Sequence, residues 1–393
     1  MPDTPNVSPE SRALIERLIG FDTTSRNSNL ELIHYVRDYL AGLGVESHLT
    51  HDGEGRKANL YATLGPEDRP GIALSGHTDV VPVDGQDWSS DPWRVVERDG
   101  QLYGRGSCDM KGFVAIALAF APRFLERGLE TPIHLCLSYD EEIGCVGVRG
   151  LLDFLASRPV KPAACIIGEP TDMKVITAHK GKLSTRCRVR GLEAHSSLAP
   201  KGVNAIDAAA KVIARLAELA ERKAAEGPFD ADYDVAHTTV HTGLIQGGTQ
   251  LNIVPGACVF EFEFRNHPED DPAALLAEIK TYAHEEVEPA MKRIAPEAGF
   301  SWEPMSAFPG LATPADAAVV TLAKALSGSN ATGKVSFGTE AGLFSGTGIP
   351  AVVCGPGSIE QAHKPDEYVS LEQLALCERF MTRLLERVAA ADA

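Results

Sequence analysis

The first 180 residues of this chain alternate short apolar runs with helical patterns, and this alternation constrains the fold more than any other feature. The apolar runs have the length of buried strands, and the segments between them repeat apolar residues at helical spacing. Such a rhythm is typical of an α/β fold with a mainly parallel sheet and helices on both faces. The runs that we expect to be strands include GIALS (71–75), IHLCLS (133–138) and ACIIG (164–168).

The pattern changes near Lys182. The segments 183–191 and 259–265 alternate inward and outward residues, as half-buried strands do, and a long helical pattern lies between them. Strands with helices on one side indicate a smaller α+β domain. Because apolar runs punctuated by Gly and Pro, like those of the first region, resume after this domain, we expect it to be an insertion. The expected domain limits are 1–182 and 292–393 for the two parts of the larger domain and 183–291 for the insertion.

Composition excludes several classes of function. The 393 residues carry a formal charge of -17 with no basic block, which argues against nucleic acid or an anionic membrane as partner. No run reaches the roughly 20 apolar residues of a membrane span, and the first residues lack the features of a signal peptide. The eight cysteines form no CxxC pair, so free buried thiols are expected. We therefore expect a cytoplasmic location.

Isolated His, Asp and Glu residues follow the expected strands. His77 and Asp79 follow the first, Glu141 and Glu142 the second, and Glu169 the third; His363 follows a later apolar run. Taken singly, each is better explained as a turn or helix-cap residue. Because open α/β sheets bind ligands at the carboxyl edge of their strands, the convergence of all of them on that edge favours one functional site.

Three consecutive carboxylates, Asp140, Glu141 and Glu142, would repel one another and their neighbours without compensation, so a bound cation is expected. Histidine and carboxylate ligands without thiolate suit a catalytic zinc, manganese or cobalt site. Asp79 stands two residues after His77 and is expected to accept the free ring N–H of that histidine. Adjacent side chains diverge in an extended segment, so Glu141 and Glu142 are expected to divide the roles of ligand and proton carrier.

These residues resemble the two-zinc amidohydrolases that include acetylornithine deacetylases, succinyl-diaminopimelate desuccinylases, aminoacylases and related carboxypeptidases. The resemblance spans nearly the whole chain. It implies that Asp109 bridges two metal ions, that His77 and Glu169 bind one of them, and that Glu142 and His363 bind the other. The matching motifs are SGHTDVVP, LYGRGSCDMKG, DEEIGC, IIGEP, GLEAHSS and QAHKPDEY.

The resemblance also implies a mechanism, in which a metal-bridging water attacks the amide with Glu141 as general base. His195 is similar to the family's oxyanion-stabilising histidine, although without the family context a surface histidine is the better explanation. Asn252 and Arg265 resemble lid residues that bind the substrate; for Arg265 an ordinary surface salt bridge explains the pattern equally well. The inserted domain is implied to form a homodimer contact.

Two segments favour one branch of the family. FDTTSRNSN (21–29) and the stretch that contains His363 are similar to acetylornithine deacetylases, which implies N2-acetyl-L-ornithine as substrate in arginine biosynthesis. Glu340 is placed to recognise the cationic side chain of that substrate. Succinyl-diaminopimelate desuccinylation and broad N-acyl-amino-acid hydrolysis or carboxypeptidase activity remain alternatives. A metal-stabilised binding protein without catalysis is a more distant one, since Glu141 would then have no purpose.

Overall fold

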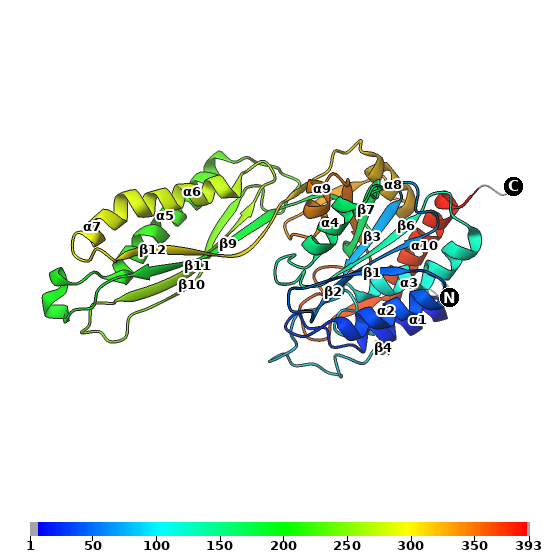
Figure 1. Cartoon of the computed structure of the whole chain (residues 1–393), viewed down its shortest axis with the longest axis horizontal. Helices are drawn as coiled ribbons and strands as arrows, with labels where there is room; N and C mark the ends of the chain where they lie inside the picture. The colour runs from blue at the N-terminus through cyan, green and yellow to red at the C-terminus, as the bar shows by residue number, and fades with distance from the viewer. Residues whose placement is uncertain (1–6, 391–393) are drawn as a thin grey trace. The chain divides into compact units, whose positions relative to one another are not determined.

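The computed structural model describes residues 7–390, and these divide into two compact units (Figure 1). The first unit comprises residues 7–178, 311–334 and 339–390. The second comprises residues 179–310 and 335–338, and so lies within the sequence of the first. No helix in the described part of the chain has the length and apolar character to cross a membrane.

A nine-stranded sheet forms the centre of the first unit. Its strands are β1 (Ser47–His51), β2 (Ala58–Leu64), β3 (Ile72–His77), β6 (Ile133–Ser138), β7 (Ala164–Pro170), β8 (Val175–His179), β13 (Leu311–Ala312), β14 (Thr332–Val335) and β15 (Ala351–Gly355). Their order is β1-β2-β6-β3-β7-β15-β8-β13, with β14 paired to β8. Strands β6, β3, β7 and β15 are mutually parallel, whereas β1 pairs antiparallel with β2, β2 with β6, and β8 with β15. The expected parallel sheet is thus confirmed for the central strands.

Helices cover both faces of this sheet. They are α1 (Pro9–Ile19), α2 (Leu30–Gly42), α3 (Lys111–Arg127), α4 (Val148–Ser157), α8 (Ala318–Ser327), α9 (Ala341–Gly346) and α10 (Leu371–Val388). Alternate strand residues such as Leu60, Leu74 and Leu135 share one core with α1, α2, α3, α8 and α10. Helices α4 and α9 contact the sheet but have no residue in that core, so they cover the opposite face. All eight cysteines are buried and free, as expected.

A small sheet connects distant parts of the first unit. Its strands are β4 (Val96–Arg98), β5 (Gln101–Tyr103) and β16 (Tyr368–Ser370), in the order β16-β5-β4. Tyr368 lies opposite Tyr103 in the antiparallel β16–β5 pair. The segments just before Asp109 and just after His363 are therefore neighbours.

The second unit is an antiparallel sheet with helices on one face (Figure 1). Three phenylalanines of the central strand β11, at positions 260, 262 and 264, pack into its core with the helices, as the alternating sequence predicts. The sheet order is β10-β11-β9-β12. The elements are β9 (Gly181–Arg190), the 3-10 helix η1 (Ser196–Lys201), α5 (Ala205–Glu226), β10 (Thr239–Gly247), β11 (Ala257–Asn266), α6 (Pro272–Tyr282), the π-helical turn η2 (Ala283–Val287), α7 (Glu288–Lys292) and β12 (Gly299–Phe308).

The compact second unit is longer than the insertion expected at 183–291, because β12 adds a fourth strand beside β9. This strand escapes sequence analysis for a physical reason. Pro304 interrupts it at a register shift, and a proline is tolerated there because β12 lies at the edge of the sheet. The larger unit resumes at Leu311 rather than at residue 292.

Candidate metal centre

The predicted metal ligands lie at the carboxyl ends of adjacent parallel strands. His77 is the last residue of β3, Glu142 follows β6, and Glu169 lies near the end of β7. His363 belongs to the segment after β15, the next strand in the sheet. Asp109 directly precedes Met110 and helix α3. The order β6-β3-β7-β15 therefore brings these side chains to one edge of the sheet.

Asp109 lies between two groups of ligands. Its Oδ1 atom is 3.0 Å from Nε2 of His77, and its Oδ2 atom is 3.2 Å from Nε2 of His363. The same His363 nitrogen is 3.0 Å from Oε2 of Glu142, while Oε1 of Glu169 is 3.7 Å from Nε2 of His77. Each carboxylate oxygen of Asp109 thus faces a different histidine, which is the arrangement that a bridging ligand needs.

Crowding perturbs the carboxyl groups of the site. Burial, together with the nearby Glu142 carboxylate, raises the pKa of Glu141 to about 8. Burial and the charge of Asp109 raise the pKa of Glu142 to about 7, and the same two causes raise that of Glu169 well above its usual range. In the absence of a cation these groups therefore favour the protonated state near neutral pH.

The imidazoles respond in the opposite sense. Hydrogen bonds with Asp109 and Glu142 raise the pKa of His363 to about 10. Burial opposes a charge on His77, yet Glu169 and Asp109 outweigh it and raise the pKa of His77 well above its usual range. Without a metal ion, the protonated imidazole rings supply the positive charge that balances the carboxylates.

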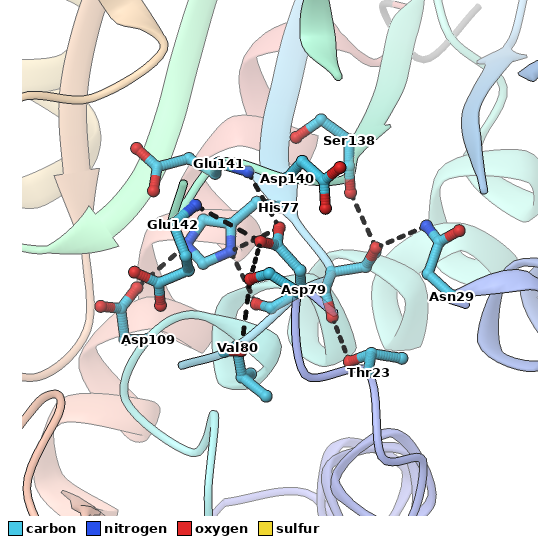
Figure 2. Close-up of polar contacts among 12 residues, drawn as sticks. Thr23, Asn29, His77, Asp79, Val80, Asp109, Ser138, Asp140, Glu141 and Glu142 are labelled. Carbon is cyan, nitrogen blue, oxygen red and sulfur yellow. Dashed lines mark hydrogen bonds and ion pairs between the residues drawn. The ribbon is translucent and has the colours of Figure 1, made fainter. Parts of the chain in front are cut away.

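Asp79 organises the loop behind the metal ligands (Figure 2). Its carboxylate accepts hydrogen bonds from the hydroxyl of Ser25 at 2.7 Å and from the backbone N–H groups of Glu141 at 3.1 Å and Glu142 at 3.3 Å. The ring nitrogen Nδ1 of His77 lies 2.9 Å from the backbone oxygen of Asp79 but 3.6 Å from its carboxylate. The expected partner of this ring N–H was the carboxylate; the carbonyl takes that role because the carboxylate is engaged by the loop.

The first of the three consecutive carboxylates has a separate partner. Asp140 pairs with Nζ of Lys57 at 2.5 Å, and both side chains are largely buried. The same ammonium group donates to the backbone oxygen of Ser25, whose hydroxyl contacts Asp79. Asp140 also has a φ of +55°, an uncommon backbone conformation for a residue other than glycine. Sequence analysis missed this pair, because only the folded chain brings Lys57 beside Asp140.

The donor set fits a divalent metal ion. Two groups of side chains, His77–Glu141–Glu169 and His77–Asp109–Glu142, each offer ligand atoms within 4.8 Å of one another. Oε1 of Glu142 is buried without a hydrogen-bond partner among the described residues. Buried carboxylates need paired charge, and imidazole and carboxylate ligands without thiolate suit zinc, manganese or cobalt. Glu141 lies within one of these groups, although it is expected to carry protons rather than to bind metal.

Comparison with known proteins identifies the family. The model of peptidase family M20/M25/M40 matches residues 73–387. The chain belongs to this family. The acetylornithine deacetylase of Myxococcus xanthus is 38% identical to this M20-family chain over 382 residues, which cover 95% of the chain and 96% of the relative. As a member of the M20 family, the chain is a metal-dependent hydrolase that acts on amide bonds.

Solved structures agree with the fold of an M20 protein. An M20-family metallo-carboxypeptidase from Sulfolobus solfataricus has a TM-score of 0.74 at 19% identity and covers 96% of this chain and 99% of its own. A dinuclear metal-binding M20 peptidase from Bacillus subtilis has a TM-score of 0.64 at 15% identity, with coverages of 95% and 96%. These likenesses show the α/β architecture with its additional smaller sheets.

The residues expected to contact substrate are distributed over both units of the M20-family chain. His195 and Asn252 are exposed neighbours in the second unit: His195 pairs with Ile253 in an isolated β-bridge, and the backbone oxygen of Asn252 accepts from Ser196 N–H at 2.9 Å. Nδ1 of His195 lies 2.8 Å from the hydroxyl of Ser197.

Arg265 and Glu340 differ in their surroundings. Nε of Arg265 donates to Glu263 at 2.9 Å, so this arginine takes part in a salt bridge on the face of its sheet. Glu340, in the first unit, is only 1% exposed, and neither of its carboxylate oxygens has a hydrogen-bond partner among the described residues. Burial raises the pKa of Glu340 to about 7.

Proposed function

We propose that the chain removes the acetyl group from N2-acetyl-L-ornithine to give L-ornithine and acetate, a step of arginine biosynthesis in the cytoplasm. The observation that carries the proposal is the position of Asp109, whose two oxygens each face a histidine. The name of the Myxococcus xanthus relative supports the choice of substrate. The proposed cofactors are two divalent ions, zinc in the first place, with cobalt and manganese as alternatives.

The five ligands divide around Asp109. In this proposal His77 and Glu169 would hold one ion, Glu142 and His363 would hold the other, and Asp109 would contribute to both. The distances of 3.0 Å from His77 and 3.2 Å from His363 to separate oxygens of Asp109 support this division. When bound, the ions would act as Lewis acids on the substrate amide and on the attacking water.

Glu141 is the proposed general base. It takes a proton from the attacking water and gives it to the departing nitrogen. Burial and the nearby Glu142 carboxylate raise the pKa of this carboxyl to about 8 in the metal-free chain, which supports a group that can accept a proton. Its backbone is tied to Asp79, and its Oε1 lies 3.3 Å from the thiol of Cys145. These contacts hold the carboxyl group beside the metal ligands.

Four further residues are proposed to recognise the substrate or the transition state. His195 would donate a hydrogen bond to the oxyanion, and Asn252 and Arg265 would contact the substrate. Arg265 must leave Glu263 to do so. Glu340 would attract the cationic side chain of ornithine, and its burial without an ion pair among the described residues supports a need for a positive partner.

The second unit is the proposed site of homodimer contact. Strand β10 is an edge strand, so its outer backbone groups are available to another chain. Leu244 and Ile245 on this strand are 62% and 54% exposed, and Leu251, just after it, is fully exposed. Exposed apolar side chains beside an open strand edge support association with a second copy.

A substrate panel tests the proposal. The metal-loaded chain is assayed on N-acetylornithine, N-acetylleucine and N-succinyl-diaminopimelate, and Glu340→Gln is assayed in parallel. We expect a preference for N-acetylornithine that narrows in the variant, because only a cationic side chain gains from the carboxylate. Equal efficiency on N-acetylornithine and N-acetylleucine would favour a broad N-acyl-amino-acid hydrolase, and a preference for the succinylated substrate would favour a desuccinylase.

A further inference from the structure

Glu367 is a fully buried carboxylate that holds the loop in front of Asp109. Its Oε1 atom accepts the backbone N–H groups of Cys108 at 2.9 Å and Asp109 at 3.0 Å, and its Oε2 atom accepts the N–H of Gly106 at 3.0 Å. The side chain has no solvent exposure. One carboxylate thus holds three backbone N–H groups of the segment 106–109, which ends at the proposed bridging ligand.

Arg105 extends this contact toward the other end of the site. One of its terminal nitrogens donates to Oε2 of Glu367 at 2.6 Å, and the other donates to the side-chain oxygen of Gln86 at 2.6 Å. The guanidinium lies over the ring of Trp88, 5.0 Å from its centroid, and its side chain is 1% exposed. A buried arginine whose two terminal nitrogens both donate hydrogen bonds has little freedom to move.

Gln86 completes the connection to His363. Its amide nitrogen donates to the backbone oxygen of His363 at 3.0 Å. His363 has a φ of +63° and a side chain that is half exposed, so packing alone does not hold it. The nearby Asp366 accepts two hydrogen bonds from Ser89, which fixes the same segment at a second point.

We propose that Glu367, Arg105 and Gln86 form a brace that sets the spacing between Asp109 and His363, so that the two side chains can share a metal ion. These three are positioning residues, because none of them offers a ligand atom to the site. The proposal rests on the metal centre proposed above. An unbroken chain of hydrogen bonds supports it. The chain runs from the backbone N–H of Asp109 through Glu367, Arg105 and Gln86 to the carbonyl of His363.

Substitutions at the two ends of the brace should affect metal binding differently. Gln86→Met removes the link to His363 but leaves Glu367 on the Asp109 loop, so one of two bound ions should be weakened. Glu367→Gln disturbs the loop of Asp109, the ligand common to both ions, so both should be weakened. Loss of such outer contacts typically reduces metal affinity about 10- to 100-fold.

Cobalt titration of the metal-free chain measures these effects without an activity assay. Calorimetry gives the affinity of each equivalent, and visible absorption reports the geometry around cobalt. Glu378→Gln is the matched control, because Glu378 also accepts several hydrogen bonds in the first unit, from Ser8 and Ser11, but has no path to a ligand. Circular dichroism and melting of each metal-free variant establish that it is folded.

The expected result is a selective loss of one equivalent of about 10-fold or more in Gln86→Met, a loss of both in Glu367→Gln, and parent values in Glu378→Gln. Parent affinities and spectra in folded Gln86→Met would overturn the brace. If Glu367→Gln does not fold, Gln86→Met decides alone, since Gln86 lies in a surface loop. If the parent chain itself binds fewer than two ions, the proposed metal centre fails. If the parent chain binds two ions but Gln86→Met keeps its affinities, only the brace fails.

Discussion

The carboxylate of Asp79 accepts the backbone N–H of Glu141 at 3.1 Å. Because Ser25 also donates to this carboxylate at 2.7 Å, Asp79 is itself held in place. The proposed general base is therefore held through its backbone by Asp79, and its carboxylate contacts the thiol of Cys145. We propose that Asp79 positions Glu141 for catalysis, and its carbonyl rather than its carboxylate holds the ring of His77.

Replacement of Asp79 tests that positioning role. We expect Asp79→Ala to lower kcat about 10- to 100-fold, because the loop of Glu141 loses its anchor. KM should change less, since Asp79 is buried and does not reach substrate. Steady-state kinetics give both values, with Asp153→Ala, an exposed carboxylate of α4, as the control. A change in KM with unaltered kcat would show that Asp79 acts on substrate binding instead.

Glu141 and Asp109 are distinguished by metal content. Glu141→Gln should keep two ions and lose about 10²- to 10⁴-fold in turnover, because only the proton carrier is removed. Asp109→Ala should lose metal, because each of its oxygens faces a different ligand histidine. Elemental analysis of both purified variants decides. Since Glu141 lies within ligand distance of His77 and Glu169, a loss of one ion in Glu141→Gln would reassign it as a ligand.

Stability of the metal-free chain should decrease as pH rises. The folded-state pKa is about 8 for Glu141 and about 10 for His363, both above the ordinary values of 4.5 and 6.5. A raised folded pKa stabilises the fold fully below the unfolded value, and that gain is lost as pH rises through the folded value. The lowered pKa of Asp109 acts only below its ordinary value of 3.8, outside this range. Burial lowers the pKa of Lys111 from 10.5 to about 7, which acts in the opposite sense, but the raised pKa values of Glu142 and Glu169 add to those of Glu141 and His363 and outweigh it.

Melting curves between about pH 6 and about pH 9 measure this dependence. The metal-free chain should lose melting temperature across that range, whereas the metal-loaded chain should change less, because bound cations replace the protons. Calorimetry in buffers of different ionisation enthalpy should record proton release on metal binding at neutral pH. A metal-free chain that gains stability with rising pH would contradict the assigned shifts.

If the second unit forms the homodimer contact, His195 can serve the metal centre of the neighbouring subunit, and mixed dimers test this extension of the proposal. Glu141→Ala and His195→Ala chains are each inactive in this proposal, but one site of a mixed dimer then combines an intact Glu141 with an intact His195. Random exchange makes half of the dimers mixed, so activity should recover to about a quarter of the parent value. Activity that stays at the level of either variant alone, under conditions shown to exchange subunits, would place His195 within its own chain.

Part of the proposed ligand set can be predicted from the sequence, because these residues stand at the ends of strands that the local pattern marks. His77 ends one strand and Glu142 follows another, and parallel strands bring their carboxyl ends to one edge. The resemblance to known amidohydrolases adds Asp109, which no strand pattern marks. The fold class follows from the same alternation of strands and helices.

The supporting contacts could not be predicted, because they join distant residues. Lys57 meets Asp140 across 83 positions, and Glu367 meets the N–H of Asp109 across 258. Neither pair leaves a spacing signal in the sequence. The last strand of the second unit was missed for another reason, since Pro304 breaks its alternation at an edge.

A zinc titration tests whether a two-metal centre built on Asp109 hydrolyses N-acetylornithine. Acetate release from N2-acetyl-L-ornithine is followed while zinc is added back to the chain after chelation, with bound metal counted at each point. We expect no activity without metal, full activity at two ions per chain, and neither binding nor activity in Asp109→Ala. Acetate release by the chelated chain, or no release at two bound ions, would contradict this expectation.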